Sequence, residues 1–158
     1  MVSREEIAAG IEKAKEMMAD AGIDSDTTYE ELVSWFESEL PVPEITVEDI
    51  VVDPFLLVQE LTQVDELVNM GVELTKEALG RDPEKVAAAR LKAMANELAV
   101  ARHFKAVGHI QRRLEYLEAR VKDDALAEDV RQGYLRLRAA SREMLEDLEN
   151  TSRQSHRC

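Results

Sequence analysis

Two leucine-rich segments, each beginning with an Asp-Pro pair, decide the fold of this 158-residue chain. Residues 53–79 read DPFLLVQELTQVDELVNMGVELTKEAL, and residues 82–98 read DPEKVAAARLKAMANEL. Aspartate followed by proline is typical of a helix start, because the carboxylate accepts free N–H groups and proline has no N–H to satisfy. Apolar residues then recur at steps of three and four. The pattern predicts a helix from Pro54 to Leu79, ended by Gly80, and a second helix beginning at Pro83, together forming a tight antiparallel hairpin.

The second helix of this hairpin is expected to be unusually long. Its heptad steps run from Ala87 to Ala101 and resume at Ile110, so the helix should reach residue 121. The intervening residues do not keep the rhythm, which predicts a kink or a change of face near Gly108. A further helix should begin at Asp123-Asp124 and run to about residue 150.

The N-terminal part of the chain carries two capping-box patterns, Ser3 with Glu6 and Thr28 with Glu31. They predict a pair of short helices ended by Gly22 and by Pro41. The expected architecture is therefore all-α with about five helices. It comprises an acidic helical pair (1–40), a connector with a single helical turn (41–53), the long-helix hairpin with a C-terminal helix (54–150) and a disordered polar tail (151–158).

The apolar stripes of the hairpin predict where the chain associates with other chains. We expect them to pack against each other and against copies of the same molecule, as in a coiled coil. Trp35, at the edge of its helix stripe, is predicted to be an interface anchor, with a place in the core as the alternative. The complete set of expected interface residues is Leu57, Leu61, Val64, Val68, Leu91, Met94, Leu98 and Trp35.

The net charge of −13 is divided unevenly along the chain. Residues 1–84 hold 5 Lys or Arg against 22 Asp or Glu, whereas residues 85–158 hold 15 against 11. Two interpretations remain open for the basic segment 85–113: ion pairing with the acidic helices of the same or a neighbouring chain, or contact with nucleic-acid phosphates. The phosphate-contacting residues would be Arg90, Lys92, Arg102, Lys105, Arg112 and Arg113. The acidic total and the lack of a helix-turn-helix argue against strong independent nucleic-acid binding.

The sequence offers little for catalysis, so no catalytic residue, metal site or cofactor is predicted. His103 and His109 are six residues apart and fall on different helix faces, and no glycine-rich phosphate loop is present. Glu30, Glu31 and Glu37 are similar to part of the magnesium motif of helical nucleotide pyrophosphatases, although Ser34 occupies its third acidic place. A small all-α metal-dependent nucleotide-processing enzyme is therefore one alternative.

The same composition points to the cytoplasm. Cys158 is the single cysteine, which excludes an intrachain disulfide and favours a reducing compartment. The chain starts without a basic head and apolar run, and it has no apolar stretch of the length that spans a membrane.

The segment from Asp53 to His109 resembles the central oligomerisation hairpin of phage small terminase subunits, particularly those of T4-like phages. The residues that carry the resemblance are Glu66 to Gly71, Leu74 to Leu79, the turn Asp82-Pro83-Glu84, and Leu91, Asn96 and Leu98. The resemblance implies rings that recognise viral DNA in the host cytoplasm and regulate a larger ATPase and nuclease subunit, without a catalytic site of their own. The C-terminal helix has no match in that family.

The sequence as a whole predicts a non-catalytic, homo-oligomeric helical assembly or adaptor protein with another protein subunit as partner. A DNA-packaging role is its most specific form, and a nucleic-acid-binding helical module is a further alternative.

Overall fold

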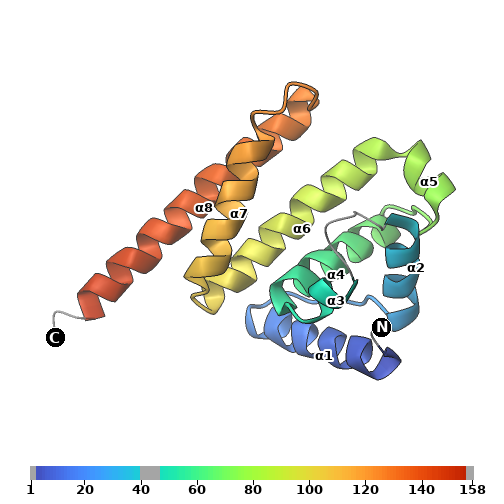
Figure 1. Cartoon of the computed structure of the whole chain (residues 1–158), viewed down its shortest axis with the longest axis horizontal. Coiled ribbons are helices and arrows are strands. Elements are labelled where there is room, and N and C mark those ends of the chain that lie inside the picture. Colours follow the sequence, from blue (N-terminus) through green and yellow to red (C-terminus); the bar gives the residue numbers. More distant parts are fainter. Residues whose placement is uncertain (1–2, 40–46, 156–158) are drawn as a thin grey trace. The chain divides into compact units, whose positions relative to one another are not determined.

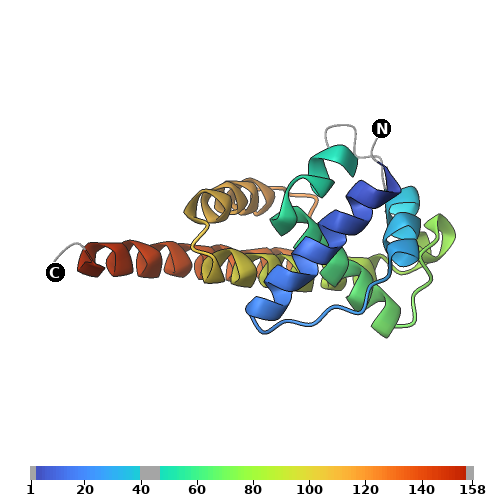
Figure 2. The same ribbon diagram turned by 90° about the horizontal axis from the view of Figure 1, so that it is seen from below.

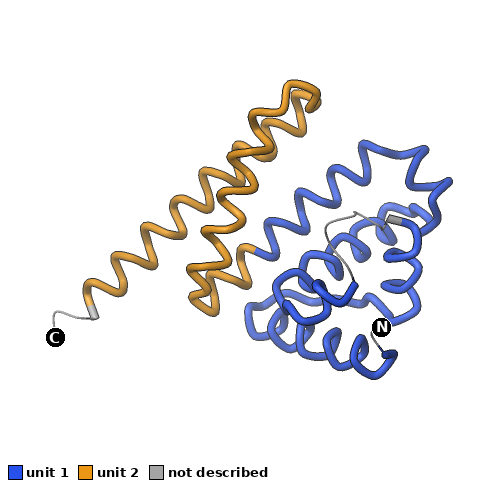
Figure 3. The backbone as a smooth tube through the Cα atoms, viewed as in Figure 1, with its two compact units in different colours: residues 1–97 blue, residues 98–158 orange. Residues whose placement is uncertain are grey.

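The computed structural model describes residues 3–39 and 47–155, and every regular element in those ranges is a helix (Figure 1). The predicted all-α class is confirmed, with eight helices instead of five over the described residues. They are α1 (Arg4–Asp20), α2 (Tyr29–Glu39), α3 (Val47–Val51), α4 (Pro54–Asn69), α5 (Lys76–Arg81), α6 (Pro83–His103), α7 (Val107–Arg120) and α8 (Glu128–Ser155). The chain forms two compact units, Met1–Glu97 and Leu98–Cys158, which divide within α6 (Figure 3).

Unit 1 is built around α4, which packs against α1, α2 and α3 (Figure 2). The buried side chains of α1 are Ile7, Ile11, Ala14 and Met18, the stripe expected from the sequence. Gly10 lets α1 approach closely, because a Cβ at this position would lie 3.0 Å from Leu57 Cδ1. Helix α4 therefore supplies the centre of the core, and its neighbours cover it from several sides.

The helix starts in unit 1 follow the predicted capping chemistry. Ser3 Oγ accepts a hydrogen bond from the Glu6 amide at 3.1 Å. Thr28 and Glu31 bond reciprocally, at 3.0 and 3.1 Å. Asp53 Oδ1 accepts from the Phe55 amide at 3.0 Å. The single turn expected in the connector is α3, while residues 40–46 lie outside the described residues.

The expected single helix over 54–79 is wrong, because α4 ends at Asn69 and a loop leads into α5. Gly71 adopts φ +77°, and the Val72 amide reaches back to the Leu67 carbonyl at 2.9 Å. This is the glycine stop that closes many helices. Gly80, the stop predicted from the sequence, lies inside α5. A loop and a short helix therefore separate α4 from α6, so the predicted tight turn between them is wrong too.

Replacing Gly71 with alanine should lower the free energy of unfolding by about 1 kcal/mol, because a Cβ is unfavourable at positive φ. The matched control is Gly80→Ala, since Gly80 is helical and a Cβ there would meet nothing within 4 Å. That substitution should be neutral or stabilising by about 0.5–1 kcal/mol. Urea denaturation of both variants tests the assignment, and equal effects at the two glycines would contradict it.

Unit 2 is dominated by a hairpin of α7 and α8, which pack along each other. The buried side chains of this hairpin include Ile110 and Leu117 of α7 and Tyr134 of α8. The Arg131 guanidinium donates to the carbonyls of Val121 and Asp123 and so closes the turn. Helix α7 has 14 residues and α8 has 28, so α8 is twice as long as its partner (Figure 1).

The break expected near Gly108 occurs a few residues earlier, between α6 and α7. Lys105 has φ +56°, and the Ala106 amide donates to the Ala101 carbonyl at 2.8 Å. The chain thus ends α6 with a left-handed stop in which lysine takes the place that glycine usually holds. The loss of heptad rhythm after Ala101 indicated the break, and its position differs because the stop does not use a glycine.

Two expectations about the C-terminal helix are corrected. The helix begins at Glu128 instead of Asp124, and it continues to Ser155, so residues 151–155 are not a disordered tail. Arg153 pairs with Glu149 at 2.6 Å, and Thr151 Oγ1 donates to the Asp147 carbonyl at 2.9 Å. These contacts one turn apart stabilise the last helical turns. Residues 156–158 lie outside the described residues.

Candidate protein–protein interface

Most residues predicted to form an interface lie inside the chain's own core. Leu57, Leu61, Val64 and Leu98 are fully buried, Met94 is 1% exposed, and Leu91 is partly buried. Trp35 is 2% exposed and donates through Nε1 to Glu60 Oε2, as in the alternative that placed it in the core. Val68 differs from the rest of the set, because 43% of it is exposed. Of these eight residues, it is the one most accessible to another molecule.

The residues predicted to contact phosphates divide between the two units. Arg90 and Lys92 lie on the unit 1 part of α6, whereas Arg102, Lys105, Arg112 and Arg113 lie in unit 2. Arg102 forms an ion pair with Asp147 at 2.9 Å. Arg113 stacks over the Tyr116 ring at 5.0 Å. The six residues therefore do not form one surface within a single unit.

Exposed apolar and basic side chains do gather where α6 meets α7. Phe104 is 41% exposed and Val107 is 40% exposed, and Lys105 and Arg112 are exposed as well. Residues 98–114 contain no Asp or Glu. We call the surface formed by Arg102, Phe104, Lys105, Val107 and Arg112 the basic junction. The left-handed stop at Lys105 places it at an exposed corner between two helices.

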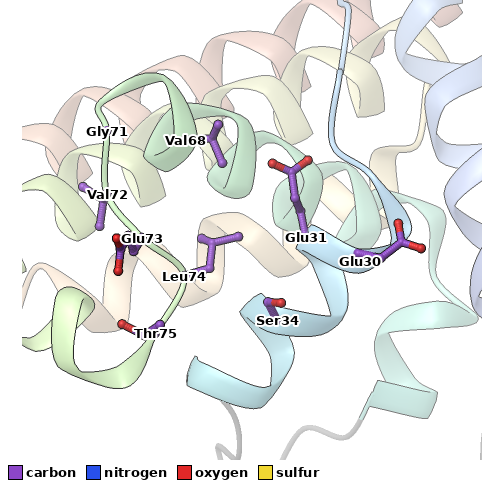
Figure 4. Close-up of a pocket in the computed structure, with 9 residues that line it drawn as sticks. All are labelled: Glu30, Glu31, Ser34, Val68, Gly71, Val72, Glu73, Leu74 and Thr75. Carbon is purple, nitrogen blue, oxygen red and sulfur yellow. The ribbon is translucent and has the colours of Figure 1, made fainter.

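A groove of opposite character lies on unit 1, between α2 and the loop that follows α4 (Figure 4). Its larger part has a volume of about 490 Å³, and an adjoining hollow of about 290 Å³ shares Glu31 and Val68 with it. The larger part includes Val68, Val72 and Leu74 as its apolar lining. Among the residues that the structure describes, no lysine, arginine or histidine lines either part. We call the whole the acidic groove, and its carboxylates are Asp24, Asp26, Glu30, Glu31, Asp65, Glu66 and Glu73.

Two of the groove carboxylates are held in place by the fold. Asp65 Oδ1 lies 2.7 Å from Thr27 Oγ1 and accepts the Asp26 amide at 3.2 Å. Glu31 belongs to the reciprocal cap at the start of α2. Asp24, Asp26, Glu30 and Glu73 are exposed at the surface of the groove. The groove therefore combines two half-buried carboxylates that are held by hydrogen bonds with four exposed carboxylates, which we call its rim.

The acidic side chains that suggested magnesium binding do not converge on one point in the structure. Glu30 forms an ion pair with Arg4, the first residue of α1, at 3.6 Å. Over residues 3–39 and 47–155, no three His, Cys, Asp or Glu side chains are close enough together to hold a metal ion. Glu30 and Glu31 instead line the acidic groove.

Several groove residues have no counterpart among the residues singled out in the sequence. Asp24 and Asp26 precede α2, Asp65 lies late in α4, and Glu73 is in the loop after Gly71. The only sequence signal for them was the excess of acid over residues 1–84, which does not say which carboxylates meet. The exposure of Val68 could not be predicted, because the sequence pattern continued the helix past Gly71, whereas α4 ends at Asn69.

Comparison with known proteins gives this chain no relative: no family model, curated protein or solved structure matches it. In the described part of the chain, none of the helices has the length and apolar character needed to cross a lipid bilayer.

Proposed function

We propose that this protein is a non-catalytic helical assembly protein that works as a homo-oligomer. One observation carries the proposal: each unit exposes apolar surface among charges that are mainly of one sign, and the prevailing sign differs between the units. Val68 lies in the acidic groove of unit 1, and Phe104 and Val107 lie in the basic junction of unit 2. Exposed apolar groups rimmed by charge are typical of surfaces that bind another macromolecule.

The charge of the two units supports the same proposal. Residues 1–97 hold 8 Lys or Arg against 23 Asp or Glu, a net charge of −15, while residues 98–158 hold 12 against 10, a net charge of +2. Surfaces of opposite sign steer molecules together and favour one register over others. A chain with both signs on separate surfaces carries both halves of a complementary pair.

Multi-angle light scattering over a range of concentrations tests the proposal. We expect a species with a mass that is a multiple of 17.8 kDa, and the oligomer should weaken as salt screens the charges. A single 17.8 kDa species at every concentration and salt level would contradict the proposal. The ring-forming, DNA-packaging role implied by the small terminase resemblance is the more specific form of this function.

Nucleic-acid binding is a second candidate, favoured by the basic junction itself. Phe104 is an exposed aromatic ring within residues 98–114, which carry no acid, and Tyr116 is exposed just after that stretch, next to Glu115. Exposed rings among basic side chains are surfaces on which single-stranded bases can stack. Fluorescence anisotropy with a labelled single strand tests this function. Binding should weaken steeply with salt, by roughly 0.7 in log–log slope for each phosphate contacted. If no binding is found at low salt, nucleic-acid binding is excluded and assembly is the function that still stands.

A further inference from the structure

Three surfaces carry chemistry that the fold does not use: the acidic groove, the basic junction and the polar outer face of α8. The exposed face of α8 carries charges of both signs along its length, among them Glu128, Arg136, Arg142 and Glu146, but it exposes no large apolar side chain. Exposed ion pairs alone contribute little to association. The groove and the junction differ from it because each combines charge with exposed apolar surface.

Resting on the proposed function, we propose that the acidic groove of one molecule receives the basic junction of a second copy, so that the copies join head to tail. The occupant is argued from complementarity within one sequence. Within residues 3–39 and 47–155, the lining of the groove has seven carboxylates and no basic side chain, although Glu30 also pairs with Arg4. The junction lies in a 17-residue stretch, 98–114, with no acid, and Arg102 pairs with Asp147 of α8.

The apolar parts of the two surfaces match as well. The groove contains Val68, Val72 and Leu74, and Val68 remains 43% exposed in the complete chain. Phe104 and Val107 remain 41% and 40% exposed in the same chain. Val72 is already buried in its own chain, so Val68, Phe104 and Val107 are the apolar side chains that a second molecule would cover. Phe104 would contact the groove's apolar lining, with Lys105 and Arg112 beside the carboxylates of its rim.

The proposed contact joins two different surfaces, which determines the kind of assembly. Each copy has one groove and one junction, so every molecule can bind one neighbour through its groove and another through its junction. Such a contact closes into a ring when the rotation between copies divides a full turn, and otherwise produces a filament. A two-fold contact in which a groove meets a groove, or a junction meets a junction, is not expected from this pairing.

Two charge-reversal variants test the pairing. The groove variant is Asp24→Lys with Glu73→Lys, at two exposed rim residues that are outside the helix caps. The junction variant is Lys105→Glu with Arg112→Glu. Each alone should weaken self-association at least about tenfold at low salt, because like charges then face each other. Circular dichroism should show unchanged helicity, since all four residues are exposed.

Mixing the two variants should restore association. The lysines of the reversed groove then meet the glutamates of the reversed junction. The unchanged junction of the groove variant meets the unchanged groove of the junction variant, as in the wild-type protein. Light scattering on the mixture should show an alternating co-oligomer with an even number of chains, which neither variant forms alone. The matched control is Glu12→Lys with Glu16→Lys, which makes the same change of charge on exposed residues of α1 and should leave association unchanged.

The outcomes separate this inference from the proposed function. A wild-type chain that is monomeric throughout overturns both. An oligomer that persists in both variants overturns the groove–junction pairing and leaves the assembly function standing. A third outcome is possible with a chain that carries all four substitutions. If this chain associates but the mixture of the groove and junction variants does not, the groove and the junction pair within one chain. A second copy is then excluded as the occupant of the groove.

An apolar substitution gives an independent readout. Phe104→Ser should weaken association about tenfold or more without changing net charge or helicity, since the ring is 41% exposed in the monomer. The effect should persist at high salt, where the charge-reversal effects fade. If Phe104→Ser associates as strongly as the wild-type protein at both low and high salt, the proposed role of this ring is wrong.

Discussion

Replacing Leu61 with alanine is expected to lower the free energy of unfolding by about 3 kcal/mol, within the 2–5 kcal/mol range for large-to-small core substitutions. Leu61 is fully buried in α4, the helix that α1, α2 and α3 cover. The substitution removes apolar contacts and leaves a cavity that several helices would have to close together. Few single changes in this chain should have a larger effect on its stability.

Urea denaturation at a fixed chain concentration measures this effect, because association would otherwise shift the apparent stability. The matched control is Val52→Ala, at a residue that is 81% exposed, and its effect should stay within about 0.5 kcal/mol. A loss below about 1 kcal/mol for Leu61→Ala would show that α4 is not the centre of the core.

Replacing Thr27 with valine is expected to destabilise unit 1 by about 2 kcal/mol, through lost hydrogen bonding at nearly constant shape. Thr27 is 1% exposed, and its hydroxyl lies 3.0 Å from the Leu61 carbonyl and 2.7 Å from Asp65 Oδ1. Valine keeps the volume but removes the donor. The carbonyl and the carboxylate are then left without this partner in a partly buried place, which is unfavourable.

Comparison with Thr27→Ser separates the hydroxyl from the methyl group. Serine retains the donor, so it should destabilise the protein by less than valine does. The same hydrogen bonds hold Asp65 at the acidic groove, so Thr27→Val should also loosen the segment before α2. Hydrogen exchange at the Asp26 amide, which donates to Asp65, should report this loosening. Equal stability of the valine and wild-type proteins would contradict the assigned role.

The helices could be predicted from the sequence wherever local chemistry decides them. Ser3, Thr28 and Asp53 cap helices through bonds to amides within three residues, which sequence spacing alone describes. The helix ends were less predictable. Gly71 and Gly80 are both glycines in a helical pattern, and only the contacts of the chain around Val72 show which one adopts positive φ.

The candidate interface could be predicted only in part. The division of charge along the chain was apparent from composition, and it pointed to attraction between the two halves or their copies. The apolar stripe of α4 was read as an interface because a repeat of leucines does not reveal whether its partner is in the same chain or another. Val68 belongs to that stripe, yet 43% of it is exposed, because it lines the groove between α2 and the loop that follows α4.

The left-handed lysine at the corner between α6 and α7 bears on how this protein could be engineered. Glycine at residue 105 would relieve a backbone penalty of about 1 kcal/mol, so selection for heat resistance alone should favour Lys105→Gly. The same change deletes a cation from the surface that we expect to recruit the neighbouring subunit. Stability and self-association therefore have opposite requirements at this position. A variant selected only for thermostability should form oligomers less well.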